Sequence, residues 1–167
     1  MKIILNLILL VFIVSFLNAQ TSQFQGTWKW INGNQTFYVF IAERTTDDGI
    51  TSIGLDYKLC EINNNTETVI YSSLVNGQNL YVGVISFGII DTNKIQGRIT
   101  DCTHPYTTDC FDGGITLEYL PASGGMNSQQ KIHWKLLNNY RGMYGYTTNT
   151  PPTGFNLPID IILTKVN

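Results

Sequence analysis

Residues 26–44, GTWKWINGNQTFYVFIAER, decide the fold of this chain. In a β-strand successive side chains point to opposite faces, so Trp28 and Trp30 share one face of the first run. Asn32-Gly33 comes next and supplies residues that tolerate a positive φ, which a tight hairpin turn requires. The residues after this turn are rich in aromatic and β-branched types, which favour a strand. The stretch therefore predicts an antiparallel hairpin.

The same alternation, bounded by turn residues, recurs along the chain, and no 3.6-residue apolar stripe appears. In the run that follows the hairpin, Ile53, Leu55, Tyr57 and Leu59 alternate with small, polar or charged residues. Further strands are expected at 66–74, 80–90, 95–100, 113–120, 130–137 and 159–166. A flat sheet of this size would expose its edges, so the sequence predicts an all-β fold: an antiparallel up-and-down β-barrel of about 8–9 strands.

A short hydrophobic leader precedes these strands. Lys2 carries the only early charge, residues 3–17 are almost entirely apolar, and the small residue Ala19 follows. This order is typical of a secretory signal peptide. A spanning helix needs about 20 apolar residues, which favours cleavage over the alternative of an uncleaved anchor. We expect a signal peptide at 1–19, export to the periplasm or the extracellular space with no membrane span after cleavage, and a single barrel domain at 20–167.

The charge distribution narrows the range of partners. The chain has 10 Lys and Arg against 12 Asp and Glu, a net charge of −2, and its basic residues are scattered. Phosphate binding needs clustered Lys and Arg, so neither nucleic acid nor an anionic membrane surface is expected as a partner. The remaining possible partners are a small apolar ligand and another protein. The sequence does not predict the oligomeric state.

The chain contains three cysteines, Cys60, Cys102 and Cys110. In an oxidising compartment Cys102–Cys110 is the favoured disulfide, closing a small loop at a gain of about 2–3 kcal/mol. Cys60 would then be the odd cysteine, buried and inert, although other pairings stay open. Reduced thiols flanking His104 could bind zinc, but no four-ligand spacing is present, so no metal or cofactor is expected.

Candidate catalytic groups are sparse. His133 falls at a polar position of its strand and is expected to be a solvated surface histidine. Asp101, Asp109 and Asp112 do not follow the spacing of a calcium loop and are expected to be solvated turn residues. No nucleophile, zinc or phosphate-binding motif occurs. We therefore expect no enzymatic activity, with a hydrolase that lacks a known motif as the remote alternative.

The segment 138–158 departs from the strand pattern. Connections longer than about 12–15 residues without regular structure are uncommon unless they act as flaps or binding loops, or are disordered. Its aromatic content argues against disorder, leaving a plug over one barrel end or a lid on a ligand pocket. The candidate ligand contacts are Tyr140, Arg141, Tyr144, Tyr146 and Phe155.

The Gly-x-Trp stretch at Gly26 and Trp28 resembles the start of calycin-type barrels such as the lipocalins and avidins. The resemblance implies that the glycine lets the chain bend at the barrel base and that the tryptophan plugs that end. It also implies a late arginine packed across the tryptophan, for which Arg141 is the candidate. We therefore expect structural roles for Gly26, Trp28 and Trp30.

The chain as a whole resembles a group of small exported bacterial proteins of unknown function. The shared features are the signal peptide, the Gly-Thr-Trp-Lys-Trp-x-Asn-Gly-Asn-Gln-Thr-Phe opening that runs from Gly26 to Phe37, and the Ile-Leu-Thr-Lys-Val ending at 162–166. This resemblance implies export but no particular activity.

Two functions fit these observations. The first is a non-enzymatic barrel that binds a small apolar or amphipathic ligand. The alternative is a protein-binding or structural envelope module, or an inhibitor, with a solid barrel core. It is motivated by strands that are apolar on both faces, such as the one in which Phe37, Val39 and Ile41 oppose Tyr38 and Phe40.

Overall fold

Antiparallel strands dominate the computed structural model, which describes residues 22–45, 51–75, 78–79, 87–101, 103, 111–121, 128–137 and 154–166. The strands are β1 (Gly26–Asn32), β2 (Gln35–Thr45), β3 (Thr51–Asn63), β4 (Thr66–Ser72), β5 (Leu74–Val75), β6 (Gln78–Asn79), β7 (Phe87–Asp91), β8 (Lys94–Asp101), β9 (Phe111–Leu120), β10 (Lys131–Leu137) and β11 (Asp160–Lys165). The predicted all-β, antiparallel up-and-down architecture is confirmed.

The first hairpin forms as predicted, with its turn one residue later than expected. Asn32 pairs with Gln35, so the two-residue loop is Gly33-Asn34. Gly33 has φ +60°, and a glycine at the first loop position suits the tight turns whose twist matches that of the flanking strands. Asn32 is the last residue of β1.

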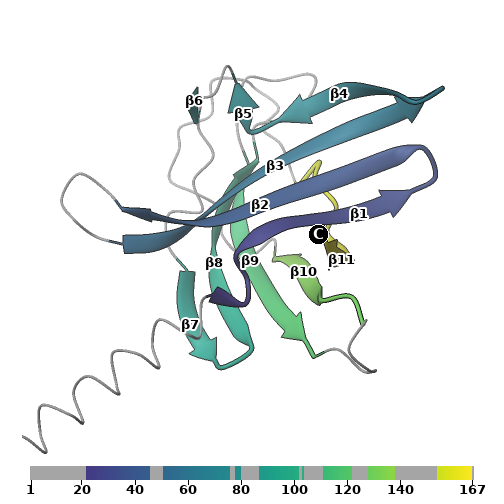
Figure 1. Cartoon of the computed structure of the whole chain (residues 1–167). Coiled ribbons are helices and arrows are strands. Elements are labelled where there is room, and N and C mark those ends of the chain that lie inside the picture. Colours follow the sequence, from purple (N-terminus) through teal and green to yellow (C-terminus); the bar gives the residue numbers. More distant parts are fainter. Residues whose placement is uncertain are drawn as a thin grey trace, which may run out of the picture.

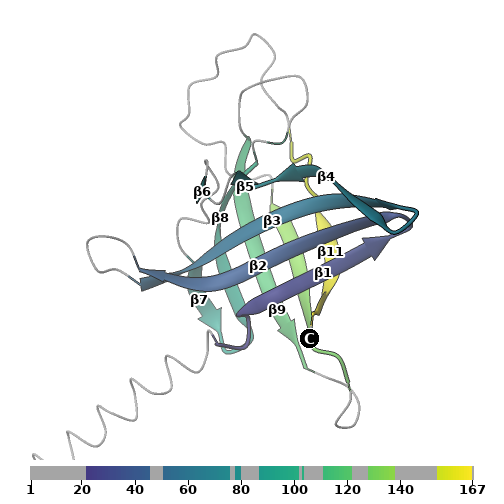
Figure 2. The same ribbon diagram turned by 45° about the horizontal axis from the view of Figure 1, so that its top comes forward.

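The main sheet has nine strands in the order β4-β3-β2-β1-β11-β10-β9-β8-β7. Within each half, consecutive strands pair with each other, and β1 pairs with β11 to join the halves. Figures 1 and 2 show the sheet strongly bent, with β1, β2 and β3 crossing in front of β8, β9 and β10. The bend creates an inner face and an outer face.

The predicted closure into a barrel is not observed. The sheet ends at β4 and β7, and no pairing joins these two strands among the described residues. β5 and β6, which lie between them along the chain, pair with each other as a separate two-stranded sheet. The long strand expected at 80–90 is described only from Phe87 onward. Alternation could predict which residues face inward, but not whether these two edges meet.

The core lies between the two crossing halves of the sheet. The rings of Phe37 on β2 and Trp134 on β10 meet edge to face, with centroids 5.5 Å apart. The inward-facing residues predicted for β3 are all buried. The fully buried large side chains are Phe24, Trp28, Phe37, Leu55, Tyr57, Ile95, Ile99, Ile115, Leu117, Ile132, Trp134 and Leu163.

Two predictions fall on residues that the structure does not describe. The leader at 1–19 precedes the described part of the chain, and both cysteines of the expected Cys102–Cys110 disulfide lie in gaps. Within the described ranges, no helix has the length and hydrophobicity to span a membrane.

Candidate functional site

One end of the inner face is built around Trp28. Its indole N–H donates to the Phe24 carbonyl at 2.7 Å, and the ring is completely buried. Lys165 lies over the ring, with its Nζ 5.3 Å from the centroid. Gly26 has φ +120°, and a Cβ there would lie 3.1 Å from the Lys165 side chain. A basic residue, Lys165, thus lies on the tryptophan, whereas Arg141, the residue expected there, lies outside the described residues.

Tyrosine rings line the inner face beneath β3 and β4. Tyr57 is fully buried, and its ring meets Tyr71 edge to face with centroids 6.3 Å apart. The Phe37 ring also packs near the Tyr57 ring, with centroids 6.1 Å apart. These contacts fix the Tyr57 side chain inside the sheet.

Asp101, at the end of β8, is a buried hydrogen-bond acceptor rather than the solvated turn residue predicted from the sequence. Its Oδ1 accepts from the Thr103 backbone N–H at 2.9 Å and from the Thr103 hydroxyl at 2.6 Å. Its Oδ2 accepts from the backbone N–H groups of Asn156 and Leu157, at 2.7 and 3.3 Å. A carboxylate has about four lone-pair sites, so Asp101 is saturated by the protein.

The prediction also fails for Asp112 on β9, which is 2 % exposed. Its Oδ2 accepts from Arg98 at 2.7 Å, and its Oδ1 accepts from the Thr100 hydroxyl. Both aspartates are buried with partners that compensate for the lost hydration. Asp109 lies outside the described residues.

Residues 154–158 cross the inner face next to Asp101. The Phe155 ring meets Phe111 edge to face, with centroids 4.8 Å apart, and packs on the hydrophobic core. It lies so close to Gly113 that a Cβ there would be 2.2 Å from the Phe155 ring. The Trp134 indole N–H donates to the Pro158 carbonyl at 2.7 Å. The segment therefore covers this part of the interior and is fixed to β8, β9 and β10.

The Tyr57 hydroxyl is the unusual group of this region. Its oxygen is buried and has no hydrogen-bond partner among the described residues. Burial raises the pKa of Tyr57, and the nearby charge of Asp101 raises this pKa further. The pKa of Tyr71 is raised by the same two causes in the same order. Both phenols stay protonated at neutral pH and are hydrogen-bond donors.

Asp101 links two ring pairs: its charge acts on Tyr57 and Tyr71, it pairs in register with Phe111, and it holds the segment that carries Phe155. We call this set the Tyr57 site: Tyr57, Tyr71, Asp101, Phe111 and Phe155. Phe155 is a ligand contact predicted from the sequence. Tyr57, Tyr71 and Asp101 were not predicted as site residues. The other predicted contacts lie outside the described residues: Tyr140, Arg141, Tyr144 and Tyr146.

Replacement of Gly113 by alanine tests the packing of Phe155. The new Cβ would lie 2.2 Å from the Phe155 ring and 2.7 Å from the Leu137 carbonyl oxygen, so the ring must move. We expect Gly113→Ala to lower the free energy of unfolding by about 1–3 kcal/mol, measured by urea denaturation.

The Phe155→Ala background provides the control for this substitution. Removing the ring removes one of the two clashes, so the cost of Gly113→Ala should fall in the double-mutant cycle. Additive effects of the two substitutions would show that the ring does not lie on Gly113.

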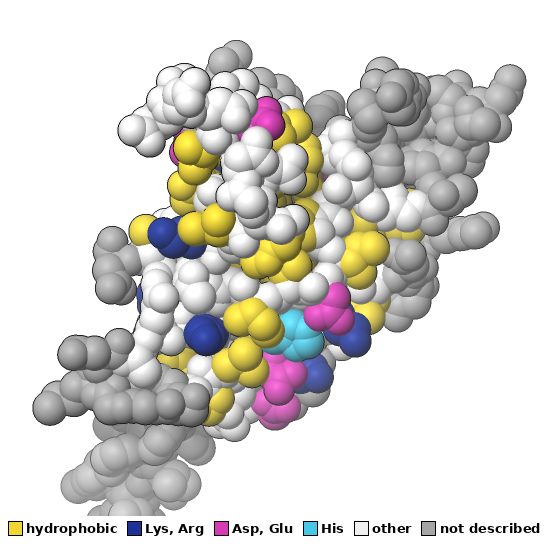
Figure 3. All heavy atoms as spheres, turned by 90° about the vertical axis from the view of Figure 1, so that its right-hand side faces the viewer, with side chains coloured by type: hydrophobic (Ala, Val, Ile, Leu, Met, Phe, Trp, Pro, Cys, Tyr) yellow, Lys and Arg dark blue, Asp and Glu magenta, His cyan; other side chains and the backbone are white. Residues whose placement is uncertain are grey.

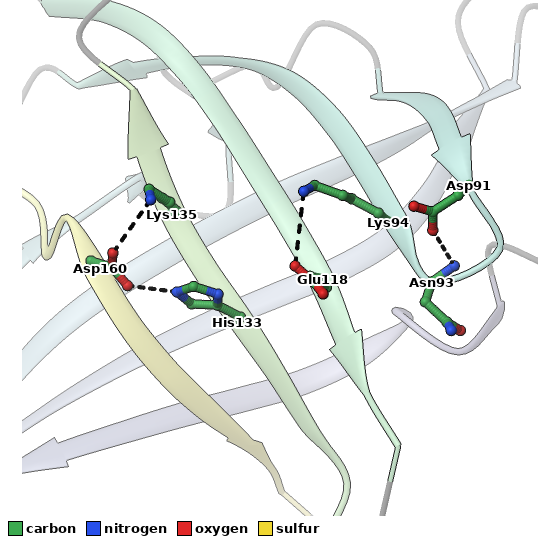
Figure 4. A network of polar contacts seen from close by, with 7 residues as sticks. All are labelled: Asp91, Asn93, Lys94, Glu118, His133, Lys135 and Asp160. Atoms are coloured by element: carbon green, nitrogen blue, oxygen red, sulfur yellow. Dashed lines mark hydrogen bonds and ion pairs between the residues drawn. The ribbon is translucent and has the colours of Figure 1, made fainter.

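The outer face carries a separate network of polar contacts (Figure 4). His133 Nε2 donates to Asp160 Oδ1 at 2.5 Å, and the Lys135 ammonium lies 3.8 Å from Asp160 Oδ2. The Lys94 ammonium on β8 lies 3.9 Å from Glu118 Oε2 on β9. Figure 4 shows His133 pointing toward Asp160, with Lys135 on the other side of that carboxylate. The expected surface position of His133 is observed; its side chain is 30 % exposed.

Asp160 should titrate at unusually low pH. The hydrogen bond from His133 is the main cause that lowers the pKa of this carboxyl below its ordinary 3.8. Because the folded-state pKa is depressed, the contact stabilises the protein above the ordinary aspartate range and is lost as pH falls through the lowered value. In an NMR titration, His133→Gln should raise the pKa of Asp160. Lys135→Gln should raise it less, and an equal shift in both variants would contradict the assignment to His133.

Cys60 lies on the outer face of β3 and is buried and free. Its thiol donates to Glu67 Oε1 at 3.2 Å, and Lys58 donates to the same oxygen at 2.6 Å. Burial, followed by the contact with Glu67, raises the pKa of the thiol, so it stays protonated at neutral pH. This environment does not activate a nucleophile.

In the described part of the chain, no three His, Cys, Asp or Glu side chains gather in a group that could hold a metal ion. No protein-family model, no curated protein and no solved structure matches this chain.

Proposed function

We propose that this protein is an exported, non-enzymatic binder of a small apolar or amphipathic ligand, which it holds at the Tyr57 site. One observation carries the proposal: the buried Tyr57 hydroxyl has no partner among the described residues. Buried polar groups are almost always hydrogen-bonded, because an unpaired one forfeits its hydration without compensation. A ligand acceptor would provide the missing partner.

The surroundings of Tyr57 support an apolar ligand. Phe37 and Tyr71 pack against the Tyr57 ring, and Phe111 and Phe155 pack against each other beside Asp101. Ligand sites are mostly apolar with a few placed polar groups. The Asp101 carboxylate is saturated by backbone and hydroxyl donors and serves as a structural acceptor. The described groups at the site therefore do not pair a nucleophile with a base, which supports binding without catalysis.

The strand order supports a relationship to calycin-type barrels. β1 pairs with β11, and the remaining strands follow in up-and-down order, as in a barrel opened along the edges of β4 and β7. The resemblance implies a late arginine across the tryptophan, and in this chain the ammonium of Lys165, a different basic residue, lies over Trp28. The leader and the Gly-Thr-Trp-Lys-Trp opening support membership in the group of small exported bacterial proteins.

A displacement assay with the neutral fluorescent probe N-phenyl-1-naphthylamine tests ligand binding. The wild-type protein should bind the probe, and Phe155→Ala should weaken binding because the substitution removes aromatic surface that packs on the core. Ile31→Ala provides a control at an exposed residue on the outer face. No binding by the wild-type protein, and no co-purified small molecule in native mass spectrometry, would refute the proposal.

A protein-binding or structural role is the second candidate. It is favoured by large apolar side chains that are exposed: Ile31, Ile62, Val69, Ile70, Ile159 and Ile162. Such side chains can mark a contact surface when they are contiguous. Figure 3 shows hydrophobic side chains interspersed with charged ones on one face of the molecule. A monomer in sedimentation experiments, together with no binding of the fluorescent probe at the surface, would argue against this role.

A further inference from the structure

The polar groups of the Tyr57 site restrict the class of ligand further than its apolar surface does. Resting on the proposed function, we infer that the site selects neutral apolar ligands with a hydrogen-bond acceptor, such as a ketone, ester or ether, and that Tyr57 is the residue that donates to it. The neighbouring carboxylate of Asp101 disfavours anionic ligands.

The first step of the argument is the direction of the hydrogen bond. The Tyr57 hydroxyl is buried, lacks a partner among the described residues, and stays protonated. Its O–H group is therefore a donor without an acceptor. A ligand oxygen with a lone pair would provide the acceptor, and a pure hydrocarbon would leave the hydroxyl unpaired.

The second step concerns Asp101. Each of its oxygens already accepts two hydrogen bonds from the protein. A ligand donor such as an alcohol or ammonium group would find no free lone pair there. Asp101 thus contributes negative charge to the site but no hydrogen-bonding capacity, which favours a ligand acceptor over a ligand donor.

The third step concerns the sign of the field. In addition to burial, the charge of Asp101, followed by that of Asp56, raises the pKa of Tyr57, and Asp56 is ion-paired with Arg44, so Asp101 is the main carboxylate acting on the hydroxyl. On the inner face, the ammonium of Lys165 lies over the Trp28 ring. A ligand carboxylate at Tyr57 would meet like charge in a region of low polarizability, whereas a ketone would not.

Three ligands of equal chain length test the inference: 2-nonanone, nonanoate and nonylammonium at pH 7. Each competes with N-phenyl-1-naphthylamine for the wild-type protein. We expect 2-nonanone to bind about tenfold more tightly than either ion. Tyr57→Phe should weaken 2-nonanone binding about tenfold and change probe binding less than twofold, because it removes the hydroxyl and keeps the ring.

Tyr38→Phe is the matched control. Tyr38 lies on the outer face of the same sheet, where its ring stacks near Phe40, and its loss of a hydroxyl should leave ketone binding unchanged. The comparison among the three ligands uses the wild-type protein alone, so it does not depend on how a variant folds.

The outcomes separate this inference from the function on which it rests. Equal affinity for ketone and nonanoate, or ketone binding unaffected by Tyr57→Phe, would overturn the inference while probe binding upheld the proposed function. Failure of the wild-type protein to bind the probe or any of the three ligands would overturn both.

Discussion

Replacement of Trp28 by alanine should greatly lower the stability of the protein. The indole is fully buried where the bent sheet closes over its inner face, and its N–H donates to the Phe24 carbonyl. Truncating a buried tryptophan costs about 3–5 kcal/mol through lost burial and the cavity left behind. Domains of this kind are stable by only about 5–15 kcal/mol. We expect a correspondingly large fall in the urea midpoint, with circular dichroism as the readout.

Two controls assign the effect to burial at this position. Trp28→Phe keeps an aromatic ring in the core and should cost less than Trp28→Ala. Trp30→Ala should also cost less, because Trp30 is only partly buried at the margin of the core. A Trp28→Ala protein within about 1 kcal/mol of the wild type would contradict the placement of Trp28.

The second large effect is expected at Asp101. Asp101→Ala leaves the N–H groups of Thr103, Asn156 and Leu157 without their acceptor. Hydrogen bonds to charged groups contribute about 1.5–3 kcal/mol each, and relaxation and water entry recover part of the loss. We expect a net loss of about 2–4 kcal/mol in the free energy of unfolding.

The local consequence identifies the mechanism. Amide hydrogen exchange at Asn156 and Leu157 should accelerate in Asp101→Ala more than exchange in β2 and β3, because the carboxylate fixes residues 154–158 to β8. Asp160→Ala removes an exposed carboxylate as a control and should leave those two amides unchanged. Unchanged exchange in Asp101→Ala would show that other contacts hold the segment.

The alternation of side chains predicted much of the fold. It predicted the buried face of β3, because burial on one face leaves a period of two in the sequence. The same period is present in β10, where Ile132, Trp134 and Leu136 are buried. The turn at Asn64, with φ +50°, was also recognisable from residue type.

The Tyr57 site was largely hidden from the sequence. Asp101 continues the inward positions of Ile95 and Ile99, which was the available signal. Its acceptor role depends on N–H groups at 156 and 157, more than fifty residues away, and no local pattern reports such a contact. From its charge alone, Asp101 is expected to face solvent.

Lys165 and the open edge of the sheet illustrate the same limit. Lys165 continues the inward position of Leu163 and pairs with Trp28 in register, a pairing between distant strands that the sequence does not specify. Whether β4 and β7 meet depends on the bend of the whole sheet and on the connection between them. Both are properties of tertiary packing rather than of local alternation.

The most direct test of this account is a ¹⁵N-resolved NMR titration of the protein with 2-nonanone. We predict that the largest shifts occur at the amides around Tyr57, Asp101 and Phe155, with little change at the exposed residues Ile31 and Val69. Shifts confined to the outer face, or none at saturating ketone, would contradict the claim that the interior beside Tyr57 receives a ligand.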